Sequence, residues 1–181
     1  MAETTNKMPL KPDIRVKSAY SLPFELLKEN GIKILLFDLD NTIASFYETF
    51  EDRKEMALAL KERCEKEGFE IALASNGKGK RVKTFCREWG VTCYPMMMKP
   101  FSYKLKKLIK EKGWDKKEVA LIGDQLMTDM KAAKHAGIFF VLTDKLVTEE
   151  PFFTRINRFF EKPMRKKINK MPYDILIKEG D

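Results

Sequence analysis

Seven polar residues follow apolar segments of the sequence, and their types suit chemistry on an anionic ligand. They are Asp38 and Asp40 after residues 33–37, Ser75 and Asn76 after 69–74, Lys99 shortly after 91–94, and Asp124 and Asp129 after 119–122. Two carboxylates placed two positions apart can divide the roles of nucleophile and general acid/base. The other polar groups can bind a cation or the anion that reacts.

The apolar segments have the pattern of strands buried on both faces, as in a parallel sheet. Five such strands are expected, at residues 33–37, 69–74, 91–94, 119–122 and 138–142. Segments with helical spacing lie between them, and glycines stand where those helices would end. This alternation predicts an α/β fold, a Rossmann-like doubly wound parallel sheet of about five strands with helices on both faces. Ligands bind such sheets beyond the carboxyl ends of the strands, where the polar residues stand.

Carboxylates gathered at one edge of a sheet repel one another. Two unit charges about 4 Å apart cost roughly 4 kcal/mol at an effective dielectric constant near 20. A divalent cation removes this repulsion, and Mg²⁺ suits a site with carboxylates, a carbonyl, waters and a phosphate oxygen. Lys99 supplies a further positive charge. One neutralised carboxylate could then attack phosphorus and form an acyl phosphate, while the second carboxylate moves protons.

The composition favours one ordinary domain whose chemistry depends on carboxylates. The chain has 181 residues, of which 44% are hydrophobic, which is enough for a single core. The sole histidine, His135, stands at the end of an expected helix, so a Ser-His-Asp triad is disfavoured. Cys64, Cys86 and Cys93 form no CxxC pair and predict neither a disulfide framework nor a zinc ribbon.

The formal net charge of +8 and the pI near 9.3 predict anionic partners. Charge alone does not choose among phosphorylated metabolites, nucleic acid and acidic lipid. No stretch reaches the roughly 18 apolar residues of a membrane span, and the first residues lack the apolar run of a signal peptide. We therefore expect a cytoplasmic protein that is at most peripheral to the inner face of a membrane.

Four short motifs make the sequence resemble the haloacid dehalogenase superfamily. DLDNT at 38–42 matches DxDx[TV], Ser75 ends an apolar strand, Lys99 follows the next strand, and GDQLMTD at 123–129 matches GDxxxTD. The wider pattern resembles a capless subclass IIIA branch, the YqeG and phosphatidylglycerophosphate phosphatase-like family. This closer resemblance covers roughly residues 13–165, with Ile43 where the family usually has leucine.

The resemblance implies a role for each of the seven polar residues. Asp38 would be the nucleophile and Asp40 the general acid/base, and a carboxylate at Asp40 is typical of the phosphatase branch. Mg²⁺ would be held by Asp38, the main-chain carbonyl of Asp40 and Asp124. The phosphoryl group would be bound by Ser75, Asn76 and Lys99, with Lys99 also balancing charge and Asp129 supporting Lys99 or the outer shell of the metal.

Several of these residues could instead have structural roles. Ser75 and Asn76 could belong to a turn that follows a strand. Thr128 and Asp129 could cap the next helix. The stretch from Asp38 to Asp40 could be no more than a polar connection.

The spacing of the motifs leaves no room for an inserted cap domain, so the site is expected to be open. We predict an N-terminal extension with a short helix at 1–32, a catalytic core at 33–142 and a basic amphipathic extension at 143–181 packed on or beside the core. Basic residues should surround the site, at Lys78, Lys80, Arg81, Lys83, Arg87, Lys104, Lys106, Lys107 and Lys110.

The segment from Pro151 predicts a helix with one apolar face, which Pro163 should end. Its apolar residues are Phe152, Phe153, Ile156, Phe159 and Phe160. A basic amphipathic segment of this kind suits an anionic membrane surface. The alternative is that the apolar face packs on the core.

Three functions are compatible with these observations. The first is a phosphatase that acts on phosphatidylglycerophosphate, an anionic phospholipid, at a membrane surface. The second is a phosphatase of soluble sugar phosphates or nucleotides. The third, an RNA-binding or assembly protein on the same scaffold, is disfavoured because the catalytic set is complete and no aromatic RNA-binding motif is present. The sequence predicts no oligomeric state.

Overall fold

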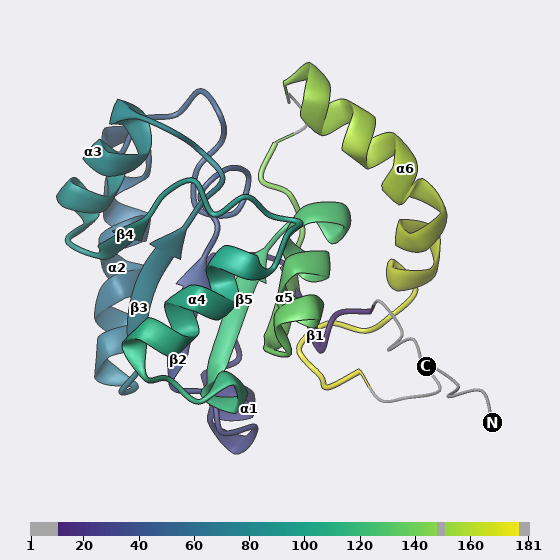
Figure 1. Cartoon of the computed structure of the whole chain (residues 1–181), viewed down its shortest axis with the longest axis horizontal. Coiled ribbons are helices and arrows are strands. Elements are labelled where there is room, and N and C mark those ends of the chain that lie inside the picture. Colours follow the sequence, from purple (N-terminus) through teal and green to yellow (C-terminus); the bar gives the residue numbers. More distant parts are fainter. Residues whose placement is uncertain (1–10, 148–150, 178–181) are drawn as a thin grey trace.

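A computed structural model describes residues 11–147 and 151–177 and contains a six-stranded parallel sheet (Figure 1). The strand order is β1-β6-β5-β2-β3-β4. The strands are β1 (Ile14–Val16), β2 (Ile34–Phe37), β3 (Glu70–Ala74), β4 (Thr92–Tyr94), β5 (Val119–Gly123) and β6 (Phe139–Thr143). The predicted fold class is confirmed, and all five expected strands are present.

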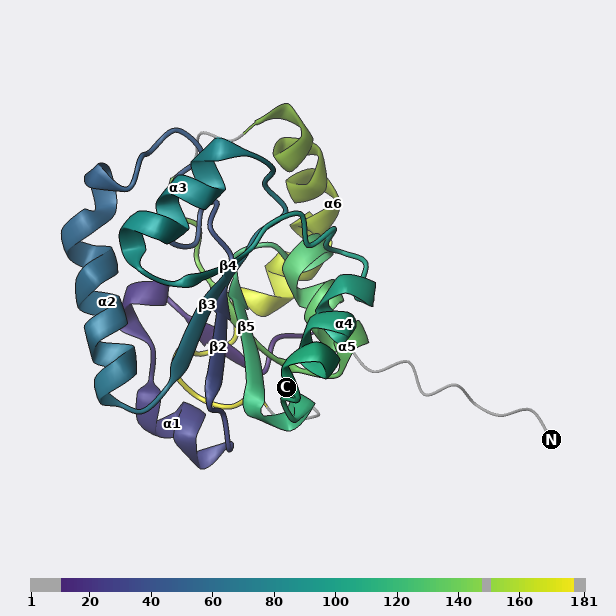
Figure 2. The ribbon, with the colours of Figure 1, turned by 60° about the vertical axis from the view of Figure 1, so that its left-hand side comes forward.

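Helices cover both faces of the sheet (Figure 2). The α-helices are α1 (Phe24–Glu29), α2 (Lys54–Lys66), α3 (Lys80–Trp89), α4 (Tyr103–Lys112), α5 (Lys131–Ala136) and α6 (Phe152–Ile168). Short helical turns lie at Ala19–Ser21, Glu51–Arg53 and Lys116–Glu118, and a π-helical turn, η4 (Leu126–Met130), precedes α5. Helices α3, α4 and α5 end at glycines with left-handed backbone conformation, as the sequence predicted.

Each strand contributes to two hydrophobic layers because its side chains alternate between the faces of the sheet. In β2, Leu35 and Phe37 pack in the layer beneath α1, α2 and α3. Ile34 and Leu36 pack in the layer beneath α4 and α5. The rigid sheet that results holds the carboxyl ends of its strands in fixed positions.

The strand order reverses at β2, and this places the site. Strands β3 and β4 continue on one side of β2, whereas β5 and β6 lie on the other. Phe37 at the end of β2 pairs with Ile122 near the end of β5. Open parallel sheets bind ligands beyond the strand ends at such a reversal. Asp38 and Asp124 are the residues that follow these two strand ends.

Strand β1 was not predicted. It lies within the segment assigned to the N-terminal extension and pairs with β6 at the edge of the sheet. Charged Arg15 stands between Ile14 and Val16, so the sequence lacks a continuous apolar run there. Arg15 is nevertheless buried, because its guanidinium donates hydrogen bonds to the carbonyl of Asn169, 3.1 Å away, and to Tyr173 Oη, 2.7 Å away.

Helix α6 differs from its prediction at Pro163, where the sequence predicted that the helix ends. It continues through Pro163 to Ile168, although an internal proline costs about 3 kcal/mol. Contacts beyond the proline offset this cost, since Arg165 bonds to Glu161 and Ile168 packs in the core.

The apolar face of α6 does not pack on the core. Phe152, Phe159 and Phe160 are 68%, 63% and 64% exposed, and the side chain of Phe153 lies outside the described residues. The buried stripe of the helix consists instead of Thr154, Glu161 and Ile168. Helix α6 therefore buries polar residues and exposes phenylalanines, which is the reverse of the usual amphipathic arrangement.

Candidate active site

Lys99 lies at the centre of the site and is almost completely buried. Its ammonium Nζ lies 2.7 Å from Asp38 Oδ1, 2.7 Å from Asp129 Oδ1 and 2.9 Å from the carbonyl oxygen of Ala74. A lysine has three N–H donors, so each of them has an acceptor within the protein. The charge-balancing role expected of Lys99 stays a prediction, which these contacts support. Direct binding of a phosphoryl group by Lys99 stays a prediction.

Asn76 and Ser75 hold the loop that carries Lys99. The amide of Asn76 donates to the carbonyl of Lys99 and accepts from its N–H, both at 2.7 Å. Ser75 Oγ accepts a hydrogen bond from Gly77 N at 3.0 Å, as in the turn considered from the sequence. Asn76 lines the pocket at the site, whereas Ser75 lies buried behind it. Their predicted contacts with the phosphoryl group stay predictions.

Asp129 is bonded to Lys99 and also closes a local turn. Its Oδ2 accepts from Gln125 N at 3.1 Å, which fixes the start of η4. A methyl group on Gly123 would lie 2.6 Å from Asp129 Cγ, so the chain approaches too closely there for any larger residue. Glycine at 123 therefore allows Asp129 to reach Lys99.

Two arginines of α6 contact Asp124, and the sequence analysis did not identify them. The Arg158 guanidinium donates to Asp124 Oδ2 and, at 2.8 Å, to the Asp124 carbonyl oxygen, which also accepts from Arg165. Both arginines pair with buried Glu161, whose Oε1 accepts from Met127 N. The spacing of 158, 161 and 165 places all three on one helical face, which is the signal that could have revealed them.

Asp40 lies at the mouth of the site and pairs with Arg81. Arg81 Nη1 donates to Asp40 Oδ1 at 2.6 Å, and Nη2 donates to the Ser45 carbonyl at 2.6 Å. Arg81 was predicted only as one of several surrounding basic residues. The structure gives it a specific contact with the expected general acid/base.

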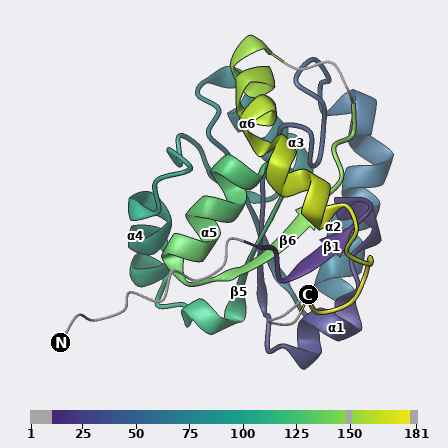
Figure 3. The same ribbon diagram turned by 90° about the vertical axis from the view of Figure 1, so that its right-hand side faces the viewer.

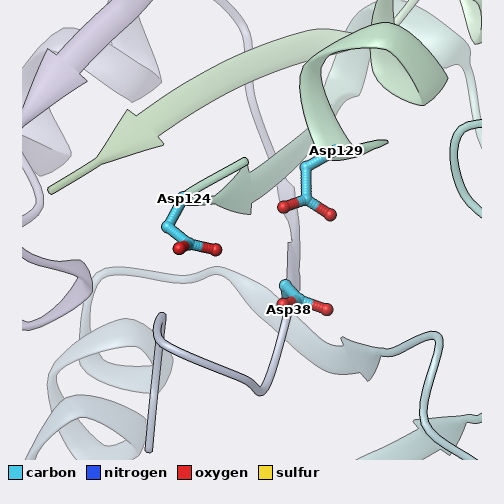
Figure 4. A group of neighbouring side chains, drawn as sticks. All are labelled: Asp38, Asp124 and Asp129. Atoms are coloured by element: carbon cyan, nitrogen blue, oxygen red, sulfur yellow. The ribbon is translucent and has the colours of Figure 1, made fainter. Parts of the chain in front are cut away.

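The carboxylates of Asp38, Asp124 and Asp129 face a common space (Figure 4). One oxygen from each lies within 4.8 Å of the others. Asp124 Oδ1 is buried and has no hydrogen-bond partner within the described residues. Hard oxygen donors and an unpartnered buried carboxylate oxygen fit a divalent cation such as Mg²⁺. The predicted ligand set included Asp38 and Asp124; its third member, the Asp40 carbonyl, stays a prediction.

Burial and neighbouring charges shift the pKa values of the site. Burial raises the pKa of Asp38 well above its usual value, against the opposing charge of Lys99. Burial raises the pKa of Asp124 to about 7, although Arg158 opposes the shift. Burial alone would lower the pKa of Lys99, but the charges of Asp129 and Asp38 raise it above its usual value. Lys99 is therefore a permanent cation.

A small pocket of about 160 Å³ opens at this cluster. It is lined by five of the seven predicted residues, and α6 forms one side of it. The lining residues are Asp38, Asp40, Phe46, Asn76, Lys99, Gln125, Thr128, Asp129, Thr154 and Asn157. Thr154 and Asn157 of α6 were not predicted as site residues. Six of the seven predicted residues thus meet at the pocket or the adjoining carboxylate cluster, and Ser75 supports them from behind.

Two solved structures share this fold. A hypothetical protein from Xanthomonas campestris superposes with a TM-score of 0.51 at 15% identity, over 75% of this chain and 79% of that one. A protein from Bacteroides fragilis, described as haloacid dehalogenase-like, superposes with a TM-score of 0.50 at 17% identity, over 80% of this chain and 95% of that one. The parallel sheet and these two likenesses define a haloacid dehalogenase-type fold.

The chain belongs to the family described as mitochondrial PGP phosphatase, whose sequence profile matches residues 3–148. It is 28% identical over 160 residues to the probable phosphatase YqeG of Bacillus subtilis (strain 168), covering 83% of this chain and 87% of the relative. It is 28% identical over 166 residues to phosphatidylglycerophosphate phosphatase 1, chloroplastic/mitochondrial, of Arabidopsis thaliana, covering 86% of this chain and 47% of that protein. The family predicted from the motifs is confirmed, and the matched range ends before α6.

The close approach at Gly123 predicts a loss of activity without a direct change to any charged residue. In Gly123→Ala the methyl group must displace Asp129 and loosen its bond to Lys99. Misplacement of this kind can lower kcat/KM by about 10². The measurement is hydrolysis of p-nitrophenyl phosphate by the purified variant. Gly113→Ala is the control, because Cβ there would meet nothing within 4 Å and only the helix cap is strained. Wild-type kcat/KM in Gly123→Ala would contradict the prediction.

Proposed function

We propose that the chain is a divalent-cation-dependent phosphomonoesterase in which Asp38 attacks phosphorus. The observation that carries this proposal is the position of Asp38, bonded to buried Lys99 at 2.7 Å and grouped with two further carboxylates at the pocket. In the first step a carboxylate oxygen of Asp38 forms a bond to phosphorus as the bond to the leaving oxygen breaks. Asp40 donates a proton to that oxygen, which leaves as an alcohol. The aspartyl phosphate then remains on Asp38.

The second step returns both carboxylates to their starting states. Asp40, now ionised, accepts a proton from water, and the resulting hydroxide oxygen bonds to phosphorus. The acyl phosphate bond breaks, which releases inorganic phosphate and restores the Asp38 carboxylate. Asp40 can do this because it lines the same pocket as Asp38 and is less deeply buried.

The charge balance supports the need for a cation. Asp38, Asp124 and Asp129 would carry three negative charges against Lys99 and Arg158, and the substrate phosphate is also an anion. Asp38 and Asp124, with the carbonyl of Asp40, are the proposed ligands of Mg²⁺. When bound, the ion would neutralise the carboxylates and polarise the phosphoryl oxygen.

The nucleophile is tested by Asp38→Asn. An amide does not attack phosphorus, so we expect turnover to fall below a tenth of wild type, toward the detection limit of the assay. Folding should persist, because the amide has nearly the same shape and carries no charge. Phosphate release and a urea unfolding curve measure the two properties. Activity above a tenth of wild type would assign the nucleophile to another residue.

Arg81 should set the pH range in which Asp40 works as an acid. Burial raises the pKa of Asp40 above its usual value, and the Arg81 guanidinium opposes this increase. A raised pKa keeps the carboxyl protonated to higher pH, which suits the proton donation proposed for it.

Removing Arg81 should therefore shift the pH profile in one direction. In Arg81→Met the pKa of Asp40 should rise further, because an opposing positive charge is lost. The alkaline limb of kcat should move to higher pH by about one unit. Lys80→Met is the control, since Lys80 is exposed on the same helix and does not contact Asp40 in the described residues. An unchanged limb, or a shift to lower pH, would contradict the assignment of Asp40.

We propose that the substrate is phosphatidylglycerophosphate, presented at an anionic membrane surface. The family and the Arabidopsis relative bear this lipid in their names. The pocket is large enough for a phosphoryl group and little more, so the rest of the substrate must lie outside it. Phe159 and Phe160 are exposed beside the site, on a helix rich in basic residues. Within the described residues no helix is both long and apolar enough to cross a bilayer.

The membrane proposal predicts a substrate preference that depends on presentation. The lipid in anionic vesicles should be hydrolysed with higher kcat/KM than glucose 6-phosphate or a nucleotide monophosphate. Basic residues near an anionic surface contribute roughly 1 kcal/mol each, so salt should weaken vesicle binding. Phe160→Asp should raise the apparent KM for the vesicle substrate and leave hydrolysis of a soluble ester unchanged. Faster hydrolysis of a soluble ester, without binding to vesicles at low salt, would favour the soluble phosphatase instead.

A further inference from the structure

We propose that a groove beside α6 binds one molecule of an anionic phospholipid at a site separate from the catalytic pocket. The groove has a volume of about 870 Å³, within the usual range for small-molecule sites. One side is α6, and the other is formed by Arg15 of β1 and by Asp144 and Lys145, which follow β6. We call it the α6 groove.

The α6 groove and the catalytic pocket share no lining residue. Helix α6 separates them: Thr154 and Asn157 line the catalytic pocket, whereas Ile156 and Phe159 line the groove. Figure 3 shows α6 extending above the sheet, with its C-terminal end at the ends of β6 and β1. A ligand in the groove therefore does not occupy the position of the reacting phosphate, although two residues that line the groove, Arg158 and Arg165, also contact Asp124 of the candidate active site.

The apolar wall of the groove indicates a hydrocarbon chain. Phe152, Ile156 and Phe159 follow one another at helical spacing along the groove and are 68%, 38% and 63% exposed. Burying such surface stabilises a complex by roughly 25 cal/mol per Å². A free phosphate or a sugar phosphate would leave this wall in water.

The charges of the groove indicate an anionic headgroup. Six of the lining residues are basic and one, Asp144, is acidic; three of the basic residues, Arg15, Arg158 and Arg165, already pair with carboxylates of the protein. Asp144 is already paired, with Arg15 at 3.0 Å and with the hydroxyl of Tyr173 at 2.6 Å. Exposed Arg155 and Lys162 border the apolar wall on α6. A neutral hydrocarbon would offer Arg155 and Lys162 no counterion, so an anionic amphiphile suits both features.

The concave shape favours a single lipid molecule over a flat bilayer. Phe160 is as exposed as Phe159 but does not line the groove. A membrane surface would contact both phenylalanines, whereas a lipid in the groove contacts only Phe159. Lys166 and Arg155 are both exposed basic residues of α6, but only Arg155 lines the groove.

The experiment compares Phe159 with Phe160 and Arg155 with Lys166, since only the first residue of each pair lines the groove. Full-length protein is titrated calorimetrically with short-chain phosphatidylglycerol below its critical micelle concentration, so that no bilayer is present. We expect saturable binding of one lipid per chain. Phe159→Asp and Arg155→Glu should each weaken it about tenfold or more, while Phe160→Asp and Lys166→Glu leave it within a factor of two. All four changes lie on an exposed face, and thermal unfolding checks that each variant is folded.

Phosphatidylcholine and inorganic phosphate test whether the groove requires both an anionic headgroup and a hydrocarbon chain. Short-chain phosphatidylcholine should bind at least about tenfold more weakly, because it has no net charge. Inorganic phosphate at equal concentration should not displace the lipid. The proposal is overturned by absence of saturable binding, by equal losses in Phe159→Asp and Phe160→Asp, by equal affinity for phosphatidylcholine, or by displacement with phosphate. Vesicle hydrolysis can fail without affecting any of these results, so the two proposals are tested separately.

Discussion

Lys99, buried between Asp38 and Asp129, is the interaction on which the rest of the site depends. An ammonium group removed from water requires acceptors for all three donors, and this lysine finds them in two carboxylates and the Ala74 carbonyl. Asn76 holds its main chain, and Gly123 leaves room for Asp129 to reach it. The geometry of the expected nucleophile therefore follows from the requirements of one buried cation. Removing Lys99 would leave two buried carboxylates without their shared counterion.

Asp124 is also a buried charged group that needs hydrogen-bond partners, and these come from α6. Its buried carboxylate and carbonyl oxygen need donors, and Arg158 and Arg165 provide them from the C-terminal helix. This requirement explains why the helix turns a polar stripe, with Glu161, toward the core and leaves its phenylalanines outside. No cap domain is present among the described residues, and α6 forms one side of the catalytic pocket through Thr154 and Asn157 and presents an apolar surface beside it.

Sequence patterns predicted the parts of the fold that are set by local periodicity. Buried strands such as Ile34–Phe37 are continuous apolar runs, and the polar residues after them follow from parallel topology. Strand β1 was not predicted, because Arg15 interrupts its apolar pattern. The contacts that bury Arg15 come from residues far along the chain, near 169–173. Arg81 was predicted only as one of several surrounding basic residues, and Arg158 was not predicted, for the same reason: only the folded chain brings them to Asp40 and Asp124.

The central claim is that buried carboxylates outnumber the buried cations and so bind a divalent metal ion beside Asp38. Calorimetric titration of the purified chain with Mg²⁺ tests it directly. We expect one saturable site, weakened about tenfold or more in Asp124→Asn and unchanged in Asp52→Asn, which alters an exposed carboxylate. Phosphatase activity should be lost in EDTA and restored by Mg²⁺. Full activity in EDTA, or equal affinity for Mg²⁺ in Asp124→Asn and wild type, would contradict the account.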